Sequence, residues 1–272
     1  DASTISGGTD NSIATNTVGA TIGGGVSNQT KNTASYSTIG GGNSNIIAPS
    51  STNSTISGGI SNEIGSATGA TNATIGGGND NTIADGGNYS AIHGGRSNDI
   101  AAATDAFIGG GNDNNIAAAV TGGTIGGGAS NNINGGTHGT IGGGQSNIIT
   151  AGTHNFIGGG QSNTITAGNY NNILGGSSNT VVSGNYSSVL GGTNNSVTGN
   201  LAFALGTGNT AANNSFALGN SATAVANEFS AKYSAGFKFE GAGTANGGFT
   251  GTFINPTGDN GISIQVGALI PT

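Results

Sequence analysis

The stretch Thr140–Val181 reads TIGGGQSNIITAGTHNFIGGGQSNTITAGNYNNILGGSSNTV and contains nearly the same phrase three times. Each phrase begins with an Ile followed by a glycine cluster, at Ile141, Ile157 and Ile173. The phrase also recurs on both sides of this stretch. Self-similarity at a fixed period is the sequence signature of a repeat architecture, so the repeat decides how the rest of the chain is interpreted.

Fourteen copies align on this apolar anchor, with steps of 16 or 17 residues for most, 19 once, and 15 and 13 at the end. The first twelve copies have Gly two and three residues after the anchor, and Asn six residues after it. Eleven of these twelve have Ile or Val eight residues after the anchor, with Thr30 the exception. The anchors are Ile5, Ile22, Ile39, Ile56, Ile75, Ile92, Ile108, Ile125, Ile141, Ile157, Ile173, Val189, Ala204 and Ala217.

This pattern predicts short strands. A helix needs apolar residues three and four apart, and each interior Gly costs it about 1 kcal/mol. Two strands per copy, joined at glycine corners, fit the spacing better. One copy cannot bury its Ile, but a stack of copies can. We therefore expect an all-β fold, a parallel β-solenoid (β-roll) of about fourteen short coils over residues 1–226, with roughly 4.7 Å between coils.

The Asn column has two explanations, which can coexist. Identical amides stacked one coil apart can hydrogen-bond along the rod, as Asn ladders do in cross-β assemblies. Alternatively, Asn merely tolerates the backbone conformation of a turn. The residues that we assign to a structural ladder are Asn131, Asn147, Asn163 and Asn179.

The positions flanking the anchor change character along the chain. They are Thr and Gly or Ser in early copies, as at Thr21 and Gly23, and become apolar in late ones. An apolar stripe on the outside of a thin solenoid usually marks an association surface. This pattern predicts a homotrimer whose interface is formed by Leu174, Leu190, Phe203, Leu205, Phe216 and Leu218.

The last copies, FALGTGNTA and SFALGNSATA with a 13-residue step, resemble the head repeat of trimeric autotransporter adhesins. The longer IGGGxxNxI copies resemble repeats of bacterial surface proteins and phage tail-fibre-like proteins, and ANEFSAKYSAGFKF (Ala226–Phe239) is similar to a segment that often follows them. The resemblance implies a left-handed β-roll of three chains around one axis. The basic neck, coiled-coil stalk and membrane anchor of the adhesins are missing, which leaves open a bacterial or viral origin.

The repeat stops near residue 227, where alternating apolar and polar residues predict strands. We expect residues 227–272 to form a β-rich cap or trimerisation segment, with donation of a strand to the next subunit of a filament as the alternative. The chain begins at Asp1 and not at Met, and we expect that a leader or a larger parent has been removed.

An aromatic column stands three residues before the anchor in consecutive copies. Its members there are His138, His154, Tyr170 and Tyr186. One hypothesis is a ligand surface, since aromatic faces stack on sugars. It gives as partner a surface glycan or an extracellular matrix protein. The alternative is a stacking ladder that stiffens the corner.

Other chemistry is weakly supported. The formal charge of −7 argues against nucleic acid, and no apolar run is long enough to span a membrane. The glycine clusters have no following helix or Lys-Ser/Thr pair and so are not phosphate loops. Asp80 and Asp113 lie two coils apart without other polar groups to make a glycosidase pair. We expect no enzyme activity, no cofactor and no metal site.

The function that fits these features is a structural and adhesive fibre segment, from a bacterial adhesin head or a viral fibre. The absence of Cys is compatible with an extracellular location, on a cell or virion surface. The alternatives are a subunit of an extracellular filament and a surface-binding solenoid acting alone, such as an ice-binding protein. The column of Thr at Thr4, Thr21, Thr38, Thr55 and Thr74 motivates the ice-binding alternative, although Ala91 and Phe107 interrupt it.

Overall fold

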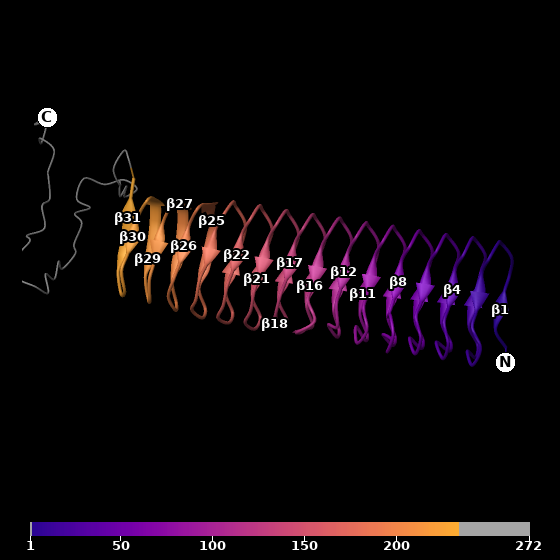
Figure 1. The fold of residues 1–272 in the computed structure, drawn as a ribbon. Helices are drawn as coiled ribbons and strands as arrows, with labels where there is room; N and C mark the ends of the chain where they lie inside the picture. The colour runs from indigo at the N-terminus through magenta and orange to yellow at the C-terminus, as the bar shows by residue number, and fades with distance from the viewer. Residues whose placement is uncertain (1, 234–272) are drawn as a thin grey trace, which may run out of the picture. The chain divides into compact units, whose positions relative to one another are not determined.

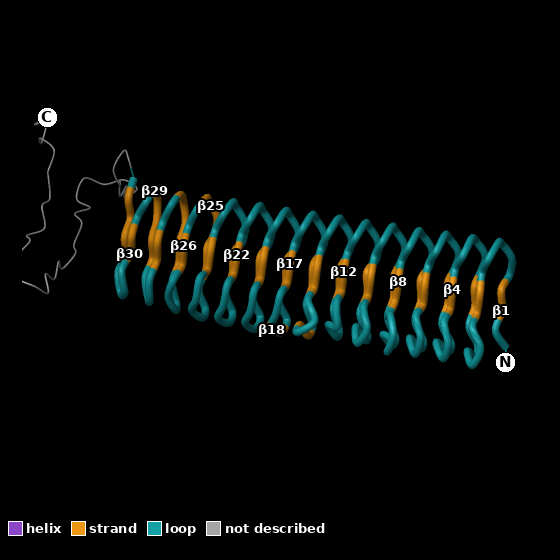
Figure 2. The backbone as a smooth tube through the Cα atoms, in the orientation of Figure 1, coloured by secondary structure: helices purple, strands orange, loops and turns teal. Residues whose placement is uncertain are grey.

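The computed structural model describes residues 2–233, which form a parallel β-solenoid of about fourteen turns (Figure 1). The chain winds through two short strands in each turn, and loops join them at the corners (Figure 2). No helix is present between residues 2 and 233, so none that could cross a membrane is found there. The predicted fold class is confirmed.

The two strands of each coil belong to two different sheets, with 15 and 14 strands. The first sheet contains β1 (Thr4–Ile5), β3 (Thr21–Ile22), β5 (Thr38–Ile39), β7 (Thr55–Ile56), β9 (Thr74–Ile75), β11 (Ala91–Ile92), β13 (Phe107–Ile108), β16 (Thr124–Ile125), β19 (Thr140–Ile141), β21 (Phe156–Ile157), β23 (Asn172–Ile173), β25 (Ser188–Thr193), β27 (Phe203–Thr207), β29 (Phe216–Asn220) and β31 (Phe229–Lys232). The second sheet contains β2 (Ser12–Ile13), β4 (Gln29–Thr30), β6 (Ile46–Ile47), β8 (Glu63–Ile64), β10 (Thr82–Ile83), β12 (Asp99–Ile100), β14 (Asn115–Ile116), β17 (Asn132–Ile133), β20 (Ile148–Ile149), β22 (Thr164–Ile165), β24 (Thr180–Val181), β26 (Ser196–Val197), β28 (Thr210–Ala211) and β30 (Thr223–Ala224). A further pair, β15 (Val120–Thr121) and β18 (Gly136–Thr137), lies at a corner.

The register follows the repeat. Each anchor pairs with the anchor of the next coil, as Ile141 does with Ile157 and Ile157 with Ile173. The second apolar column pairs in the same way, as Ile149 does with Ile165. Because the inward positions are aliphatic in nearly every coil, aliphatic side chains stack on one another along the rod.

Two columns of aliphatic side chains make the core. The anchors from Ile22 onward are completely buried, and so are the Ile and Val of the second column from Ile47 onward, whereas Ile13 is half-buried. Alternation along each short strand turns one residue inward and its neighbours outward. Thr30 is the exception in the second column: it is buried at a position that is otherwise aliphatic or Ala, and its hydroxyl has no hydrogen-bond partner.

The last glycine of each cluster, three residues after the anchor, is required by geometry. Gly160 has φ +90°, a region that L side chains rarely adopt. A Cβ added there would lie 2.1 Å from the carbonyl oxygen of Gly176 in the next coil. Both the backbone angle and the approach of the next coil therefore exclude a side chain.

The Asn column forms the expected amide ladder. The Asn163 backbone N–H donates to the Asn147 Oδ1 at 3.0 Å. The Asn163 Nδ2 donates to the carbonyl of Gly159 in its own coil and to that of Gly176 in the next. All four predicted members, Asn131, Asn147, Asn163 and Asn179, are fully buried. The ladder therefore satisfies buried polar groups of two coils at once.

A second buried ladder lies at the opposite corner, and sequence analysis missed it. The Asn171 N–H donates to the Asn155 Oδ1, and the Asn155 Nδ2 donates to the carbonyls of Ala151 and Gly168. This repeats the bonding of Asn163 at a spacing of eight residues. Each 16-residue coil here consists of two similar halves, and His154 occupies in one half the place that Ser162 occupies in the other.

The shortest coils, at the C-terminal end of the rod, have longer strands. β27 and β29 pair over five residues, from Phe203 with Phe216 to Thr207 with Asn220. The ladder continues through Asn209. The alignment of the copies did not reveal this member, because the corner before it is one residue shorter. β31 adds a further strand, which begins in the segment assigned to the cap. The rest of that segment, residues 234–272, lies outside the described residues.

Candidate functional site

The predicted ligand-contact residues occupy a corner where the backbone is left-handed. His138, His154, Tyr170 and Tyr186, hereafter the His–Tyr stripe, have φ between 53° and 57°. Bulky residues in this region are uncommon, and Gly, Asn and Asp adopt it more readily. In other coils the same position holds Gly19, Tyr36, Asn53, Asn72, Tyr89, Asp105, Gly122, Leu201, Asn214 and Asn227.

The four rings stack on one another along the rod. Ring centroids are 4.9 Å apart for His138 and His154, 5.1 Å for His154 and Tyr170, and 5.0 Å for Tyr170 and Tyr186. The interplanar angles are only 2° to 10°. The faces of the two inner rings are therefore covered on both sides, and their edges point to solvent. A sugar cannot stack on those faces, so the sequence-based idea of face stacking does not fit.

A polar column runs beside the stripe, one residue earlier in each coil. Its members are Thr137, Thr153, Asn169 and Asn185. The Asn169 Oδ1 accepts from the Thr153 N–H at 2.8 Å, and the Asn185 Oδ1 accepts from the Asn169 N–H at the same distance. These amides hold the corner in register from outside. Sequence analysis missed this column, although Asn169 and Asn185 stand at matching positions of consecutive copies.

The predicted trimer-interface residues lie on the outer face of the first sheet, hereafter the apolar stripe. Leu174 is 55% exposed, Leu190 41% and Phe203 39%. Leu205, Phe216 and Leu218 are half-buried. Leu205 pairs with Leu218 in the neighbouring strand, so the stripe is continuous along the last coils.

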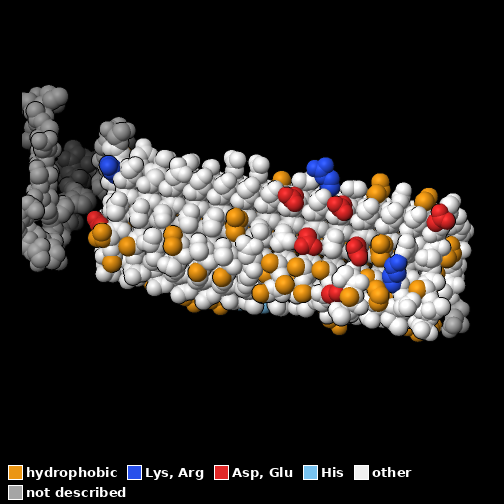
Figure 3. Space-filling model, viewed as in Figure 1, with side chains coloured by type: hydrophobic (Ala, Val, Ile, Leu, Met, Phe, Trp, Pro, Cys, Tyr) orange, Lys and Arg blue, Asp and Glu red, His pale blue; other side chains and the backbone are white. Residues whose placement is uncertain are grey.

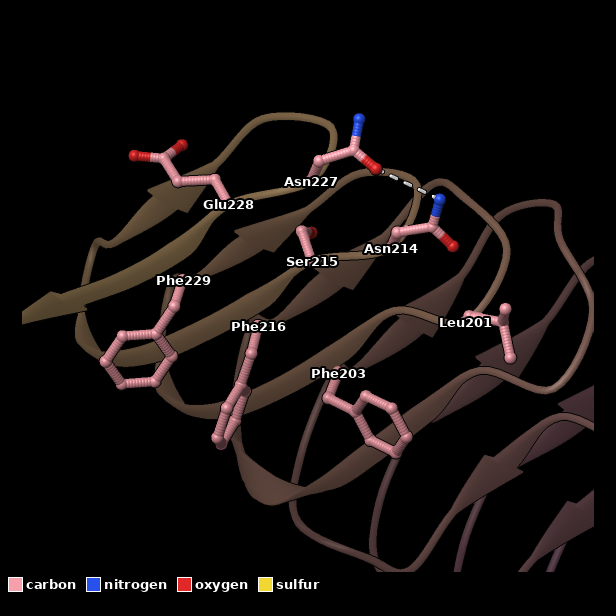
Figure 4. Close-up of a pocket in the computed structure, with 8 residues that line it drawn as sticks. All are labelled: Leu201, Phe203, Asn214, Ser215, Phe216, Asn227, Glu228 and Phe229. Carbon is pink, nitrogen blue, oxygen red and sulfur yellow. Dashed lines mark hydrogen bonds between the residues drawn. The ribbon is translucent and has the colours of Figure 1, made fainter. Parts of the chain in front are cut away.

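Phe229 extends the apolar stripe by one coil, which sequence analysis did not foresee. The rings of Phe203, Phe216 and Phe229 project to the same side from three neighbouring strands (Figure 4). Their centroids are 6.3 Å and 5.4 Å apart in sequence order. The three rings line a shallow groove together with residues of the adjoining corner, including Leu201 and Glu228 (Figure 4).

Charged side chains of the described rod lie before residue 114 and, at the C-terminal end, at Glu228 and Lys232. Residues 114–227 contain no Asp, Glu, Lys or Arg. On the face shown in Figure 3, most acidic and basic side chains gather over the N-terminal half of the rod, and a few lie at its C-terminal end. The His–Tyr stripe lies wholly within the uncharged residues, whereas the apolar stripe reaches Phe229, beside Glu228.

Three carboxyl groups before residue 114 have shifted pKa values. Burial raises the pKa of Glu63, with a smaller contribution from the Asp85 charge, while Lys31 acts in the opposite direction. Burial also raises the pKa of Asp99, and a hydrogen bond from Asn115 partly offsets it. For Asp85, partial desolvation is outweighed by hydrogen bonds from Ser66 and the following backbone, which hold its pKa well below the usual range.

The Asp85 carboxylate has a structural role. The Asp85 oxygens accept from the backbone N–H groups of Ser66, Ala67 and Gly69, so this carboxylate closes a loop. Asp80 and Asp113 lie on the same corner with Ser97 in the coil between them. Within residues 2–233 no three His, Cys, Asp or Glu side chains gather in a way that could hold a metal ion.

Comparisons with known proteins add no relative. A scan against protein-family models found no match, and a search of curated proteins found none either. The fold and the two stripes are therefore the basis for any statement about function.

Proposed function

We propose that this chain is a structural and adhesive segment of an extracellular fibre, on a cell or virion surface, and that it works as a homotrimer. The stacked coils supply a stiff rod, and the two stripes supply contacts. The apolar stripe joins the three chains, and the rest of the uncharged residues 114–227 faces the surface to which the fibre adheres.

The apolar stripe is the observation that carries this proposal. Leu174, Leu190 and Phe203 lie on consecutive coils and Phe229 two coils further on, and each is between 39% and 56% exposed. Burying one such side chain is worth about 1.5–3 kcal/mol relative to leaving it in water. When three copies of the stripe meet around an axis, this burial free energy is gained for several side chains of each chain. The Thr and Gly of the early coils would contribute no comparable burial free energy.

The resemblance of FALGTGNTA and SFALGNSATA to the head repeats of trimeric autotransporter adhesins supports the same arrangement. In this chain the resemblance covers two coils with long strands, β27 and β29, and the Phe rings that they carry. The more general IGGGxxNxI copies support a rod and leave open whether the parent fibre is bacterial or viral.

The molar mass in solution tests the proposal. We expect a trimer by light scattering for the intact chain, and dissociation when Leu205→Asp and Leu218→Asp are combined, because charges would then meet in a buried interface. The matched control combines Thr38→Asp and Thr55→Asp, which lie on the outer face of the same sheet in the early coils and should leave the mass unchanged. A monomeric mass for the unaltered chain contradicts the homotrimer.

A second candidate function is a surface-binding solenoid acting alone, such as an ice-binding protein. The outer face of the second sheet supports this ice-binding candidate better than the first sheet does, because the Thr column of the first sheet is interrupted. Its outward positions hold Thr or Ser in five consecutive coils, at Thr164, Thr180, Ser196, Thr210 and Thr223. A monomer with thermal-hysteresis activity would favour this candidate over the fibre.

A further inference from the structure

We propose that the His–Tyr stripe is a binding site for a neutral, extended β-linked polysaccharide, which lies along the rod and is recognised through the edges of the rings. The proposal deepens the adhesive part of the function proposed above and rests on it. It assigns the ligand class and the atoms that contact it.

The backbone of the His–Tyr stripe is strained. All four residues of the stripe hold the left-handed conformation, which costs a bulky side chain more than it costs Asn or Gly. The same column is occupied by Asn53, Asn72 and Asn214 in other coils, so the fold itself accepts Asn there. Four consecutive aromatic residues at a position that favours Asn indicate a role beyond forming the corner.

The stacked rings present polar groups with free hydrogen-bonding capacity to solvent. Tyr170 is 45% and Tyr186 58% exposed, and neither hydroxyl makes a hydrogen bond within residues 2–233. Stacking covers the ring faces, so the exposed groups are the phenol hydroxyls and the imidazole nitrogens. The Asn169 Nδ2, in the column beside them, also donates no hydrogen bond in the described part of the chain.

The distance between coils sets the spacing of these polar groups along the rod. These groups recur every 4.9–5.1 Å over four coils. That distance is close to the length of one pyranose unit in an extended β-linked chain. Successive sugars can therefore meet equivalent hydrogen-bonding groups without a change of register.

The absence of charge selects a neutral polymer. No Asp, Glu, Lys or Arg occurs in residues 114–227, which include every coil of the stripe. An anionic glycan would find no Lys or Arg to pair with its acidic groups, and a cationic one would find no carboxylate. Binding through neutral hydrogen bonds is also nearly independent of salt, because screening acts on charges.

Two other occupants fit the geometry poorly. A peptide strand adds to an unpaired sheet edge, but β19, β21 and β23 are each paired on both sides. A zinc ion with Zn–N distances of about 2.0–2.1 Å needs two ligand nitrogens roughly 3.4 Å apart. Equivalent atoms of His138 and His154 lie about one coil apart, since their nearly parallel rings are 4.9 Å apart.

The experiment measures binding of the intact chain to neutral β-linked hexaoses (cellohexaose, a β-1,3-glucan hexaose and mannohexaose) by calorimetry, with polygalacturonate and chitosan as charged probes. We expect binding to at least one neutral hexaose, unchanged between low and high salt, and none to the charged polymers. Combining His138→Asn, His154→Asn, Tyr170→Asn and Tyr186→Asn should weaken binding at least about tenfold, with the melting temperature and molar mass retained. The matched control combines Tyr36→Asn and Tyr89→Asn, isolated members of the same column, and should bind as the unaltered chain does.

A conservative variant separates edge recognition from a merely structural ladder. Tyr170→Phe combined with Tyr186→Phe keeps both rings in the stack and removes only the hydroxyls. We expect roughly a fivefold or greater loss of affinity, because each hydroxyl contributes a hydrogen bond. Unchanged affinity in this variant, or no binding of any neutral hexaose by the unaltered chain, overturns the proposal. A trimer that binds no hexaose would overturn this inference alone and leave the fibre proposal intact.

Discussion

Asn163 shows how a single residue type holds neighbouring coils together. A primary amide has two N–H donors and an oxygen acceptor, and Asn163 uses both kinds of group. Its Nδ2 bonds carbonyls of its own and the next coil, and its Oδ1 accepts the N–H of Asn179. Asp would lack the donors. The recurrence of Asn at this position therefore follows from the need to satisfy buried backbone groups between glycine corners.

Replacing Asn163 with Ala should destabilise the fold by roughly 2–4 kcal/mol. The side chain's hydrogen bonds are lost, and the buried N–H of Asn179 is left without its acceptor, which adds a cost of its own. Chemical denaturation measures the difference in the free energy of unfolding. Asn134→Ala is the control because Asn134 is exposed. Equal effects of the two substitutions would show that the ladder contributes no stability.

At the scale of an element, the coils differ in length, and the additional residues lie at the corners. The longest step between anchors is 19 residues, from Ile56 to Ile75. The strands on either side keep their register, as Thr55 still pairs with Thr74. The additional residues form a loop that Asp85 of the next coil closes with its carboxylate. Length changes are tolerated because the loop lies outside both sheets.

The hydrogen bonds by which the Asp85 carboxylate closes the loop, hereafter the Asp85 clasp, should make the stability of the fold depend on pH. Its folded-state pKa is lowered, so its contribution is complete above the unfolded pKa of about 3.9 and is lost as the pH falls through the folded value. We expect Asp85→Asn to lower the melting temperature at pH 7. The difference from the unaltered chain should shrink as the pH drops below about 5.

Glu63→Gln serves as the comparison for this pH series. Burial raises the pKa of Glu63, so its ionised form opposes folding at neutral pH. Its replacement should therefore raise the melting temperature at pH 7, and this gain should disappear in acid. A pH-independent difference between Asp85→Asn and the unaltered chain would contradict the clasp.

At the scale of the whole rod, residues 2–233 form a quasi-one-dimensional stack. Each coil pairs with the coil before it and the coil after it, and its aliphatic residues join one continuous core. In the first coil this cover is incomplete, and Ile5 is 43% exposed although the equivalent Ile22 is fully buried. Stability in such a stack is a sum over coils and their interfaces.

Hydrogen exchange should therefore be graded along the rod of the 272-residue chain. Amides of the first coil, around β1 and β2, should exchange fastest because fraying there breaks only one interface. Amides of the central coils, such as those of β19 and β21, should exchange slowest. Mass spectrometry of peptides from each coil measures the gradient. Equal protection of the first and the central coils would contradict a stack that opens from its end.

Much of the fold was predictable from the sequence because its period is regular. Anchors 16 or 17 residues apart could only be buried by stacking, and stacking places Ile141 on Ile157 and Asn147 on Asn163. The glycine corners followed from the same alignment. The apolar stripe was also identified by position, since the neighbours of an inward residue in a strand point outward.

The rest was decided only by the three-dimensional arrangement. Asn155 and Asn163 occupy equivalent places in the two halves of a coil. This equivalence is hard to see in the sequence, because the 17-residue coils have an additional residue at one corner. The left-handed backbone of His154 and Tyr170 is set by the corner, against their own preference. Their spacing in sequence placed them in one column. Which part of each ring is exposed to solvent depends on how the ring packs against its neighbours. Stacking covers the faces and leaves the edges, because the distance between coils lets consecutive rings touch.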